Sequence, residues 1–200
     1  SKKNTIKLNL DLWSMKNKKI FAVVGMTGSG KTEVVKYLQK KLDCGKIYFG
    51  EITFERMKRE KIEVSYKNEQ IMREKIRAEK GMGAYAELSL LKIKKALKEN
   101  DVVVVESLYS WSEYKIIKEK YPNNFQVIAV HASPKIRFLR LKNRKNERPM
   151  KTRKEFITRD FSEIENIEKG GPIARADYMI VNEGSLKKLY AELDKILCLT

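Results

Sequence analysis

The chain has 200 residues, of which 42% are hydrophobic and 34% are charged. This length predicts a single core with insertions, because two ordinary domains and a linker would need more residues. No stretch is apolar over the length that a membrane span or the centre of a signal peptide requires, so we expect a cytoplasmic protein that does not enter a membrane. The 2 cysteines lie far apart without CxxC spacing, which disfavours a zinc knuckle and a disulfide framework.

The balance of 43 Lys and Arg against 26 Asp and Glu gives a net charge of +17, which predicts affinity for a polyanion. Phosphates, nucleic acid and anionic lipid are all compatible with charge alone. Many lysines fall on the polar sides of expected helices, as Lys36, Lys40 and Lys94 do, where a solvated surface is the simpler interpretation. We therefore favour a solvated surface over a dedicated nucleic-acid patch, and nucleic acid stays an alternative partner.

Residues 1–18 are polar and basic, and we treat them as an N-terminal extension whose role stays open. From residue 19 onward, short apolar strands alternate with amphipathic helices. This alternation predicts an α/β fold, a five-stranded parallel sheet with flanking helices. Strands are predicted at 20–24, 46–49, 102–105, 125–130 and 178–181. Helices are predicted near 31–42, 51–60, 68–79, 83–99, 112–120, 134–145, 152–168 and 185–197.

The first strand runs directly into a segment that matches the phosphate-loop pattern GxxxxGK[ST] at every fixed position. Its glycines allow consecutive N–H groups to face one anion, and the helix that follows adds the positive end of its dipole. We expect Lys31 to contact the β- and γ-phosphates of a nucleoside triphosphate and the Thr32 hydroxyl to ligate Mg²⁺. The predicted nucleotide-binding residues of this loop are Gly25, Met26, Thr27, Gly28, Ser29, Gly30, Lys31 and Thr32.

A phosphate loop predicts the nucleotide but not the reaction. The chain lacks the [NT]KxD sequence that usually gives GTPases their guanine specificity, which disfavours a regulatory GTPase. It is also short for a helicase or a motor ATPase. A kinase, a nucleic-acid-binding ATPase and a nucleotide sensor stay open at this point.

From Lys19 to about Ile196 the sequence resembles the small nucleotide kinases, and more closely the adenylate kinase/dephospho-CoA kinase-like group of archaeal-type P-loop proteins. The resemblance implies a P-loop NTPase fold with a monophosphate-binding insertion at about 50–85 and a lid at about 137–160, in a kinase-like domain at 19–200. It also implies ATP and Mg²⁺ as cofactors and phosphoryl transfer to a small phosphorylated acceptor, such as a nucleoside monophosphate or a dephospho-CoA-like nucleotide. The segments that carry it are the phosphate loop, Phe49-Gly50-Glu51-Ile52, Ala132-Ser133-Pro134 with the following Arg137 and Arg140, and residues 176–184.

The last of these segments concerns the donor nucleotide. Related kinases carry Asn-x-Gly just after the final strand, so the resemblance places Asn182, Glu183 and Gly184 beside the adenine ring. A strand-to-helix turn with Ser185 as N-cap is the alternative interpretation, and it is compatible with the first.

The acceptor side resembles the family less closely. Related kinases usually carry an arginine four residues after the glycine of the second segment, and Phe54 stands there. Arg56 is the candidate to replace it, and Arg77 is preferred to Arg73 further along, with an exposed helical charge as the alternative for each arginine. The predicted acceptor-binding residues of the insertion are Glu51, Arg56, Arg77 and Gly83.

The apolar strand at 102–105 runs into Glu106, where P-loop enzymes commonly place an acidic residue that holds Mg²⁺ through water or accepts the acceptor's proton. The related proteins have Asp-Gly-Ile-Arg at this point. The resemblance therefore implies the acidic role for Glu106, whereas Ser107 and Tyr109 depart from the glycine and the arginine. These departures leave the identity of the acceptor open.

Arginines recur between residues 137 and 153, where related kinases carry a mobile lid. Arginine suits this task because its planar fork binds phosphate oxygens bidentately. Arg137, Arg140 and Arg144 fall on nearly one face of an expected helix, and we predict that they stabilise the transferred phosphoryl group. Arg148 is predicted to bind the acceptor. A basic, solvent-exposed helix face is the alternative for each of these arginines.

Phosphoryl transfer from ATP·Mg²⁺ to a small acceptor is therefore the predicted function. A nucleic-acid-binding ATPase or polynucleotide kinase is one alternative, and salt-sensitive binding to single-stranded RNA would favour it. A non-enzymatic nucleotide sensor is the other, and nucleotide binding without phosphoryl transfer would favour that. The sequence does not predict the oligomeric state.

Overall fold

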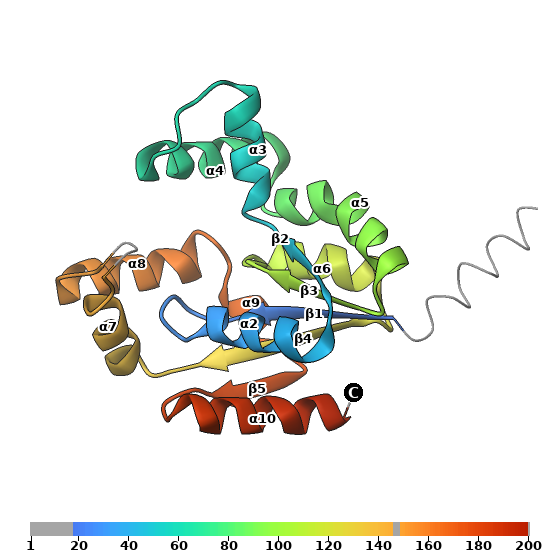
Figure 1. Cartoon of the computed structure of the whole chain (residues 1–200). Helices are drawn as coiled ribbons and strands as arrows, with labels where there is room; N and C mark the ends of the chain where they lie inside the picture. The colour runs from blue at the N-terminus through green and yellow to red at the C-terminus, as the bar shows by residue number, and fades with distance from the viewer. Residues whose placement is uncertain (1–17, 146–148, 200) are drawn as a thin grey trace, which may run out of the picture.

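The computed structural model describes residues 18–145 and 149–199, so residues 1–17 of the predicted extension and Arg148 lie outside the described residues. Within the described part, five strands form a sheet in the order β2-β3-β1-β4-β5, and each neighbouring pair is parallel. Helices flank this sheet on its two faces (Figure 1). The predicted fold class is confirmed. The strands are β1 (Lys19–Val24), β2 (Gly45–Tyr48), β3 (Val102–Glu106), β4 (Phe125–His131) and β5 (Tyr178–Val181).

Each predicted helical segment contains a helix, and the structure adds a short one that the sequence did not predict, α9 (Gly170–Ala174). The expected helix at 134–145 ends at Lys142, so Arg144 follows it instead of continuing its face. None of the helices in the described ranges has both the length and the apolarity that a bilayer crossing requires. The other helices are α2 (Lys31–Leu42), α3 (Glu51–Arg59), α4 (Tyr66–Lys80), α5 (Ala84–Glu99), α6 (Trp111–Lys120), α7 (Pro134–Lys142), α8 (Arg153–Glu165) and α10 (Leu186–Leu199).

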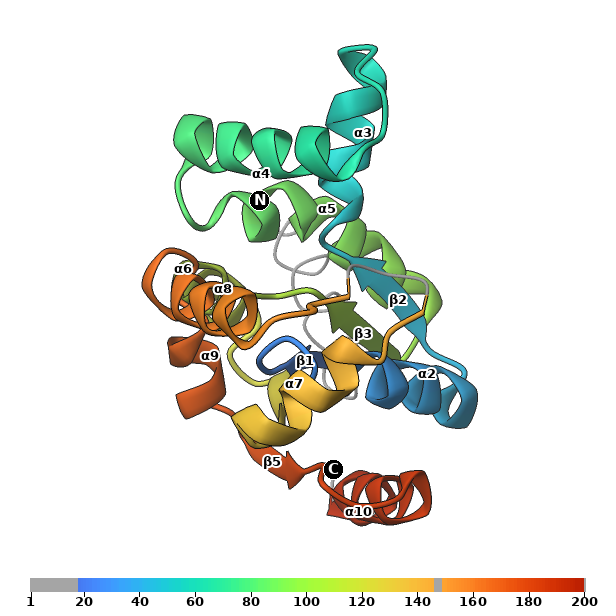
Figure 2. The same cartoon turned by 90° about the vertical axis from the view of Figure 1, so that its left-hand side faces the viewer.

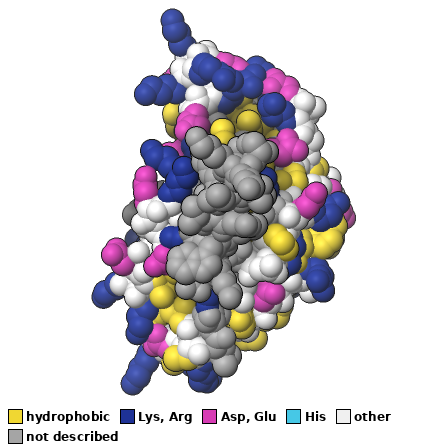
Figure 3. All heavy atoms as spheres, turned by 90° about the vertical axis from the view of Figure 1, so that its right-hand side faces the viewer, with side chains coloured by type: hydrophobic (Ala, Val, Ile, Leu, Met, Phe, Trp, Pro, Cys, Tyr) yellow, Lys and Arg dark blue, Asp and Glu magenta, His cyan; other side chains and the backbone are white. Residues whose placement is uncertain are grey.

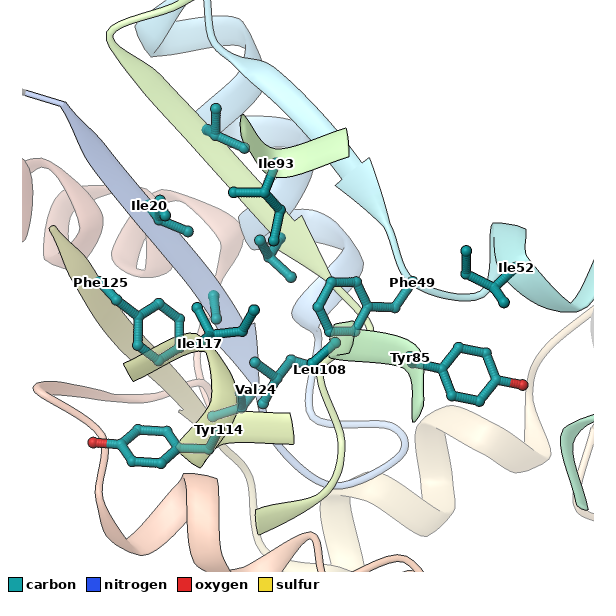
Figure 4. Packing of buried hydrophobic residues seen from close by; sticks show 14 of the residues in the cluster. Ile20, Val24, Phe49, Ile52, Tyr85, Ile93, Leu108, Tyr114, Ile117 and Phe125 are labelled. Atoms are coloured by element: carbon teal, nitrogen blue, oxygen red, sulfur yellow. The ribbon is translucent and has the colours of Figure 1, made fainter. Parts of the chain in front are cut away.

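The valine run in β3 contributes to two apolar cores, one on each side of the sheet. Val103 and Val105 belong to one buried cluster and Val104 to the other, because successive side chains of a strand point to opposite faces. A strand that is buried on both faces lies inside a parallel sheet, and β3 does lie between β2 and β1. Figure 4 shows the first cluster, which extends from Ile20 on β1 to Tyr85 on α5.

The carboxyl ends of the strands lie along one edge of the sheet, where ligands bind in folds of this type. Val23 is in register with Glu106, so the end of β3 lies beside the start of the loop that follows β1. Helices α3 and α4 project beyond this edge, and α7 and α8 project beyond it as well (Figures 1 and 2). The segments predicted as insertion and lid therefore lie around the phosphate loop.

Replacing Phe21 by Ala tests the packing of the second core. Phe21 is 1% exposed and packs in the buried cluster that includes residues of α2 and α10. Loss of the ring and the cavity it leaves should lower the free energy of unfolding by about 3–5 kcal/mol, measured by urea denaturation. Phe161→Ala is the control, because that ring is 58% exposed on α8, and its effect should stay within about 0.5 kcal/mol. Equal losses in the two variants would contradict this packing.

Candidate functional site

The phosphate loop connects β1 to α2 and has a backbone that only glycine accommodates. Gly25 has φ 145°, and a Cβ there would lie 2.4 Å from the carbonyl oxygen of Val130 on the neighbouring strand. Gly30 has φ 104°, and a Cβ there would lie 2.2 Å from the side-chain nitrogen of Asn182. Any side chain at either position would clash and would also strain the backbone. The loop therefore follows the tight path that phosphate binding requires.

The N-terminus of α2 is available to an anion. Its N-cap is Gly30, which offers no side chain to accept from the first N–H groups of the helix. The buried Ser29 hydroxyl on the same loop has no hydrogen-bond partner. Unpaired donors at a helix N-terminus form a ready anion site, because the helix dipole adds positive potential there. These features fit the phosphates of a nucleoside triphosphate.

Lys31 begins α2 and donates a 3.0 Å hydrogen bond from Nζ to the carbonyl oxygen of Met26. Burial, together with the nearby positive charges of Lys169, Arg144 and Arg159, lowers the pKa of Lys31 to about 7, against the opposing effect of Glu163. Burial is the largest of these causes, and three of the four charged neighbours are positive. A polyanion bound at the loop would supply the missing negative charge.

Glu163 on α8 brings a buried carboxylate to the phosphate loop. It accepts hydrogen bonds from the Thr27 hydroxyl and, at 3.2 Å, from the Thr27 N–H. It also pairs with Lys169 at 2.8 Å and with Arg159 at 3.2 Å. Burial alone would raise the pKa of Glu163, but Lys169, Thr27 and Arg159 together outweigh it and lower the pKa to about 2. This carboxylate stays ionised at neutral pH.

The predicted lid arginines take different positions at the loop. Arg137 is buried, donates to the Thr27 carbonyl at 3.2 Å and forms a bidentate pair with Asp160 of α8, which fixes its guanidinium. Arg140 donates from NH1 to the Ser29 carbonyl at 3.3 Å and from NH2 to the Asn182 carbonyl at 2.8 Å. Although Arg144 follows α7, it still lines the same pocket as Arg140. That pocket of about 170 Å³ is lined by Gly28, Gly30, Lys31, Thr32, Glu33, Arg140 and Arg144.

The segment after β5 packs against the phosphate loop. The Asn182 side chain is buried and donates a 2.8 Å hydrogen bond to the Ser29 carbonyl. The carboxylate of Glu183 accepts from the Ser133 N–H at 2.6 Å, and this bond holds the pKa of Glu183 below its ordinary value. Gly184 follows these two residues before α10 begins. The structure thus brings the predicted adenine-side residues next to the loop and shows their polar side chains engaged with backbone groups.

Glu106 ends β3 at the same edge of the sheet. Its carboxylate pairs with Lys46 of β2 at 2.6 Å, a partner that the sequence did not predict. Ser107 follows with φ 69°, a left-handed conformation that glycine adopts more readily than serine. Tyr109 donates from its hydroxyl to the Ser107 hydroxyl at 3.0 Å. Tyr48 belongs to this group too, because burial and the nearby Tyr109 and Glu106 raise its pKa to about 12.

Arg77 on α4 contacts side chains of α5 and α6. Its guanidinium lies 4.9 Å from the centre of the Tyr85 ring, and NH2 lies 3.8 Å from Oε1 of Glu113. Both the Nε of Arg77 and Oε1 of Glu113 are buried without a hydrogen-bond partner. Burial raises the pKa of Glu113 to about 7, although the N–H groups of Tyr109 and Ser110 donate to its other oxygen and oppose that rise. Buried polar atoms without partners mark a place where a ligand can complete the hydrogen bonding.

The other predicted acceptor residues make contacts within the insertion and with the helices that follow it. Arg56 is paired with Glu60 and, at 3.0 Å, with Glu79 of α4. Glu51 is held by Lys92 of α5 at 2.8 Å. Gly83 is the N-cap of α5, and a Cβ there would lie 2.3 Å from the Ile116 side chain, so its role in packing is visible. Arg56 also lines a separate pocket of about 370 Å³ with Ile52, Glu55, Arg59, Ile76, Lys80 and Leu88.

A magnesium site would use few protein ligands here. Among the described residues, no group of three or more His, Cys, Asp or Glu side chains is arranged to hold a metal ion. A hydroxyl at Thr32 and a carboxylate at Glu106 are nevertheless oxygen ligands of the kind that Mg²⁺ prefers, and this ion usually keeps several waters and binds phosphate oxygens as well. The donors present therefore fit a Mg²⁺ that arrives with the nucleotide.

Several residues of the site had no signal in the sequence. Glu163 lies 136 positions from Thr27, and Lys169 stands in a stretch rich in glycine that reads as a loop. Glu113 resembled any acidic residue in the first turn of a helix. Lys46 sits on a short strand and is exposed, as alternation predicts, so nothing in the sequence linked it to Glu106. These residues reach the site because segments that are distant in the sequence pack together, and a single sequence does not show which segments do so.

The low pKa of Lys31 predicts a pH-dependent stability. In the unfolded chain the pKa is near the ordinary 10.5, so the unfolded state binds more protons than the folded state between about pH 7 and 10.5. The free energy of unfolding should therefore rise with pH in this window, by up to about 1.4 kcal/mol per pH unit, relative to Lys31→Met. Urea denaturation of both proteins at pH 7 and pH 9 measures the difference. A difference that does not change with pH would contradict the lowered pKa.

Solved structures with the same fold include several kinases. Shikimate kinase from Bacteroides thetaiotaomicron matches with a TM-score of 0.58 and 19% identity, over 90% of this chain and 98% of that chain. A gluconokinase from Sinorhizobium meliloti 1021 matches with a TM-score of 0.51 and 17% identity, over 90% of this chain and 93% of that chain. At these identities the likeness establishes the fold, which is that of the P-loop kinases.

Sequence relatives are closer and extend over most of the chain. A UPF0200 protein of Thermococcus kodakarensis is 35% identical over 89% of this chain and 96% of its own length. A UPF0200 protein of Methanocaldococcus jannaschii is 32% identical over 89% of this chain and 88% of its own length. The family described as "AAA domain" matches residues 22–168. The chain therefore belongs to the AAA-domain family and to the UPF0200 proteins, and it has the fold of a P-loop kinase.

Proposed function

We propose that the protein transfers the γ-phosphoryl group of ATP, bound with Mg²⁺, to a small phosphorylated acceptor such as a nucleoside monophosphate or a dephospho-CoA-like nucleotide. The observation that carries this proposal is the phosphate loop. Its glycines have left-handed backbones, the helix that follows has no side-chain N-cap, and charged side chains surround Lys31. Together these features leave an anion site open. The kinase fold of solved structures and the position of α3 and α4 above the same sheet edge support an acceptor site opposite the donor.

The donor side binds and orients the triphosphate. N–H groups of residues 25–32 and the N-terminus of α2 bind the phosphates, and Lys31 exchanges its bond to Met26 for the β- and γ-phosphates. Asn182, Glu183 and Gly184 flank the nucleoside. Asn182 and Arg140 both donate to the Ser29 carbonyl, and Arg140 also donates to the Asn182 carbonyl. These bonds fix the nucleoside side and the phosphate side relative to one another.

The arginines have different roles toward the transferred phosphoryl group. Arg140 and Arg144 line the pocket beside Lys31 and are placed to neutralise charge on the phosphates. Arg137 holds the loop through the Thr27 carbonyl while Asp160 fixes its orientation, so it acts on the phosphoryl group from a rigid position. In this arrangement, α7 and α8 together cover the donor and exclude water.

The acceptor side combines aromatic rings with a buried arginine. Tyr48 ends β2, Tyr109 lies in the loop after β3, and Tyr85 on α5 packs beside the Arg77 guanidinium. Aromatic rings stack on nucleobases, and an arginine fork binds a phosphate. Arg77, with its unpartnered Nε, is the group we assign to the acceptor's anionic part. Glu51, Arg56, Gly83 and Arg148 are proposed to bind the acceptor as well.

Glu106 is the acidic residue that we assign to the reaction itself. Its carboxylate lies at the end of β3, level with Val23 just before the phosphate loop, and Lys46 holds it in place. We assign it either to a water-mediated hold on Mg²⁺ or to acceptance of the acceptor's proton at its carboxylate oxygen. The Thr32 hydroxyl supplies the direct protein ligand. When bound, Mg²⁺ supplies positive charge that neutralises the β- and γ-phosphate oxygens.

The pairing of the basic residues favours a small acceptor over a nucleic acid. Lys36, Lys41, Lys75 and Lys195 are each paired with a nearby carboxylate. On the face in Figure 3, Lys and Arg side chains lie among acidic ones and do not form one continuous stripe on its visible part. A protein that follows a nucleic-acid backbone needs unpaired positive charge along a groove.

Lys31→Ala should lower the rate of ATP-dependent phosphoryl transfer by about a hundredfold or more, because the charge that stabilises the β- and γ-phosphates is removed. The matched control is Lys36→Ala, which removes a lysine one turn and a half along α2 whose side chain is 67% exposed. That variant should stay within about twofold of the wild type. The assay follows ADP release with Mg²⁺, ATP and a panel of nucleoside monophosphates and dephospho-CoA.

Two results would count against the proposal. The first is an absence of ADP production by the wild type with every acceptor in the panel. The second is full activity in Lys31→Ala, which would mean that the reaction takes place somewhere else.

Arg77→Gln should raise the KM for the best acceptor of the panel about tenfold and leave the KM for ATP unchanged, because a charge-assisted hydrogen bond to the acceptor is lost. Arg73→Gln is the control on the same helix, since Arg73 pairs with Glu69 at 3.2 Å. Thermal unfolding of both variants checks that they fold. Equal KM values for the two variants would show that the acceptor is bound elsewhere.

A further inference from the structure

One carboxylate at the phosphate loop is surrounded by donors in the way that a phosphate group would be. Oε2 of Glu163 accepts from the Thr27 N–H at 3.2 Å and from Lys169 Nζ at 2.8 Å. Oε1 accepts from the Thr27 hydroxyl and from Arg159 Nε at 3.2 Å. A backbone N–H, a hydroxyl, an ammonium and a guanidinium thus converge on one anion. This is the donor set that phosphate sites use.

The position of this carboxylate along the loop indicates which phosphate it resembles. Thr27 lies in the middle of the phosphate loop, away from the start of α2, which stays open to the other phosphates. Glu163 is also close enough to Lys31 to raise its pKa. Since the lysine of a phosphate loop reaches the β- and γ-phosphates, the Glu163 carboxylate occupies the end of the site that a terminal phosphate would take.

The charges around Lys31 also indicate that Glu163 stands where a phosphate would bind. Among the strongest electrostatic influences on Lys31, those of Lys169, Arg144 and Arg159 are positive and that of Glu163 is negative. Lys169 is 4% exposed, and its Nζ also lies 4.3 Å from the centre of the Tyr109 ring on the acceptor side. A buried lysine between the loop and the acceptor side needs an anion, and in this structure the protein supplies it.

We propose that Glu163 is a resident substitute for the terminal phosphate, and that Lys169 and Arg159 bind that phosphate once ATP displaces the carboxylate. The proposal rests on the proposed function, because it takes a nucleoside triphosphate as the ligand of the loop. Lys169 then becomes a catalytic residue, since it touches the transferred group, and the Tyr109 ring keeps its ammonium in place while the anion is exchanged.

The exchange has a consequence for nucleotide selectivity. A diphosphate leaves the Thr27 end of the site to Glu163, so it binds without competition from the carboxylate. A triphosphate must displace Glu163 and then gains Lys169 and Arg159. Substitutions at these positions should therefore act on triphosphate binding and leave diphosphate binding nearly unchanged.

Calorimetric titration of the full chain with the β,γ-imido analogue of ATP and with ADP, both with Mg²⁺, tests this selectivity. Glu163→Gln and Glu163→Asp should each lower the Kd of the analogue by about tenfold, because the competing carboxylate is removed or no longer reaches Thr27. Lys169→Met should raise that Kd by about tenfold. The Kd of ADP should stay within about twofold in all three variants.

Two comparisons separate this exchange from other effects. Glu165→Gln removes the same charge from an exposed position on α8 and should leave both Kd values unchanged. Glu163→Asp keeps the charge and shortens the side chain. Tighter binding of the ATP analogue by this variant would therefore result from the lost contact with Thr27 and not from a change in the electrostatic field. It also serves as the second variant if Glu163→Gln does not fold.

Weaker binding of the analogue in both Glu163 variants would overturn the inference, because it would show that Glu163 holds Lys169 and Arg159 in position for the nucleotide. Equal effects on ADP and on the analogue would overturn it as well. If the wild type binds neither nucleotide, the proposed function itself fails. If it binds both without a selective effect of Glu163, only this inference fails.

Discussion

The positive charge gathered around the phosphate loop is the constraint on which the rest of the site depends. Burial and three basic neighbours bring the pKa of Lys31 to about 7, so the folded chain places its cations closer together than their charges favour. Two carboxylates of α8 relieve part of this repulsion. Asp160 fixes Arg137, and Glu163 holds Lys169 and Arg159. Helix α8 therefore supplies carboxylates that pair with basic residues at the loop, and its Phe156 also packs against residues of α7.

The region that we propose for the acceptor differs, because burial leaves polar atoms there without hydrogen-bond partners. Arg77 and Glu113 face one another at 3.8 Å, beyond a normal hydrogen bond, and each has a buried atom without a partner. At the phosphate loop, Glu163 pairs with basic residues, whereas Arg77 Nε and Glu113 Oε1 have no hydrogen-bond partner. The two halves of the site thus differ in how far the folded chain itself satisfies them.

Local signals in the sequence predicted much of the fold. The valines at 102–105 and the glycines of the phosphate loop each indicate a local structure from a few consecutive residues. The strands, the fold class and the helix after the loop are as these signals predicted. Helix α9 was not predicted, because Gly170, Gly171 and Pro172 normally indicate a turn. The pairs Glu163–Thr27 and Lys46–Glu106 were not predicted, because each joins two segments that come together only in the folded chain. The roles of the predicted site residues stay predictions.

Asn182 has a consequence for the order in which the site forms. Its side chain donates to Ser29, 153 positions earlier, its N–H donates to His131, and its carbonyl accepts from Arg140. Contacts that close so long a loop form late, because the chain must first lose the entropy of bringing its ends together. During synthesis, the phosphate loop leaves the ribosome long before β5 does. The hydrogen bond between Asn182 and the loop therefore forms only after the last strand has been made, so a nascent chain that still lacks β5 has the motif without this bond.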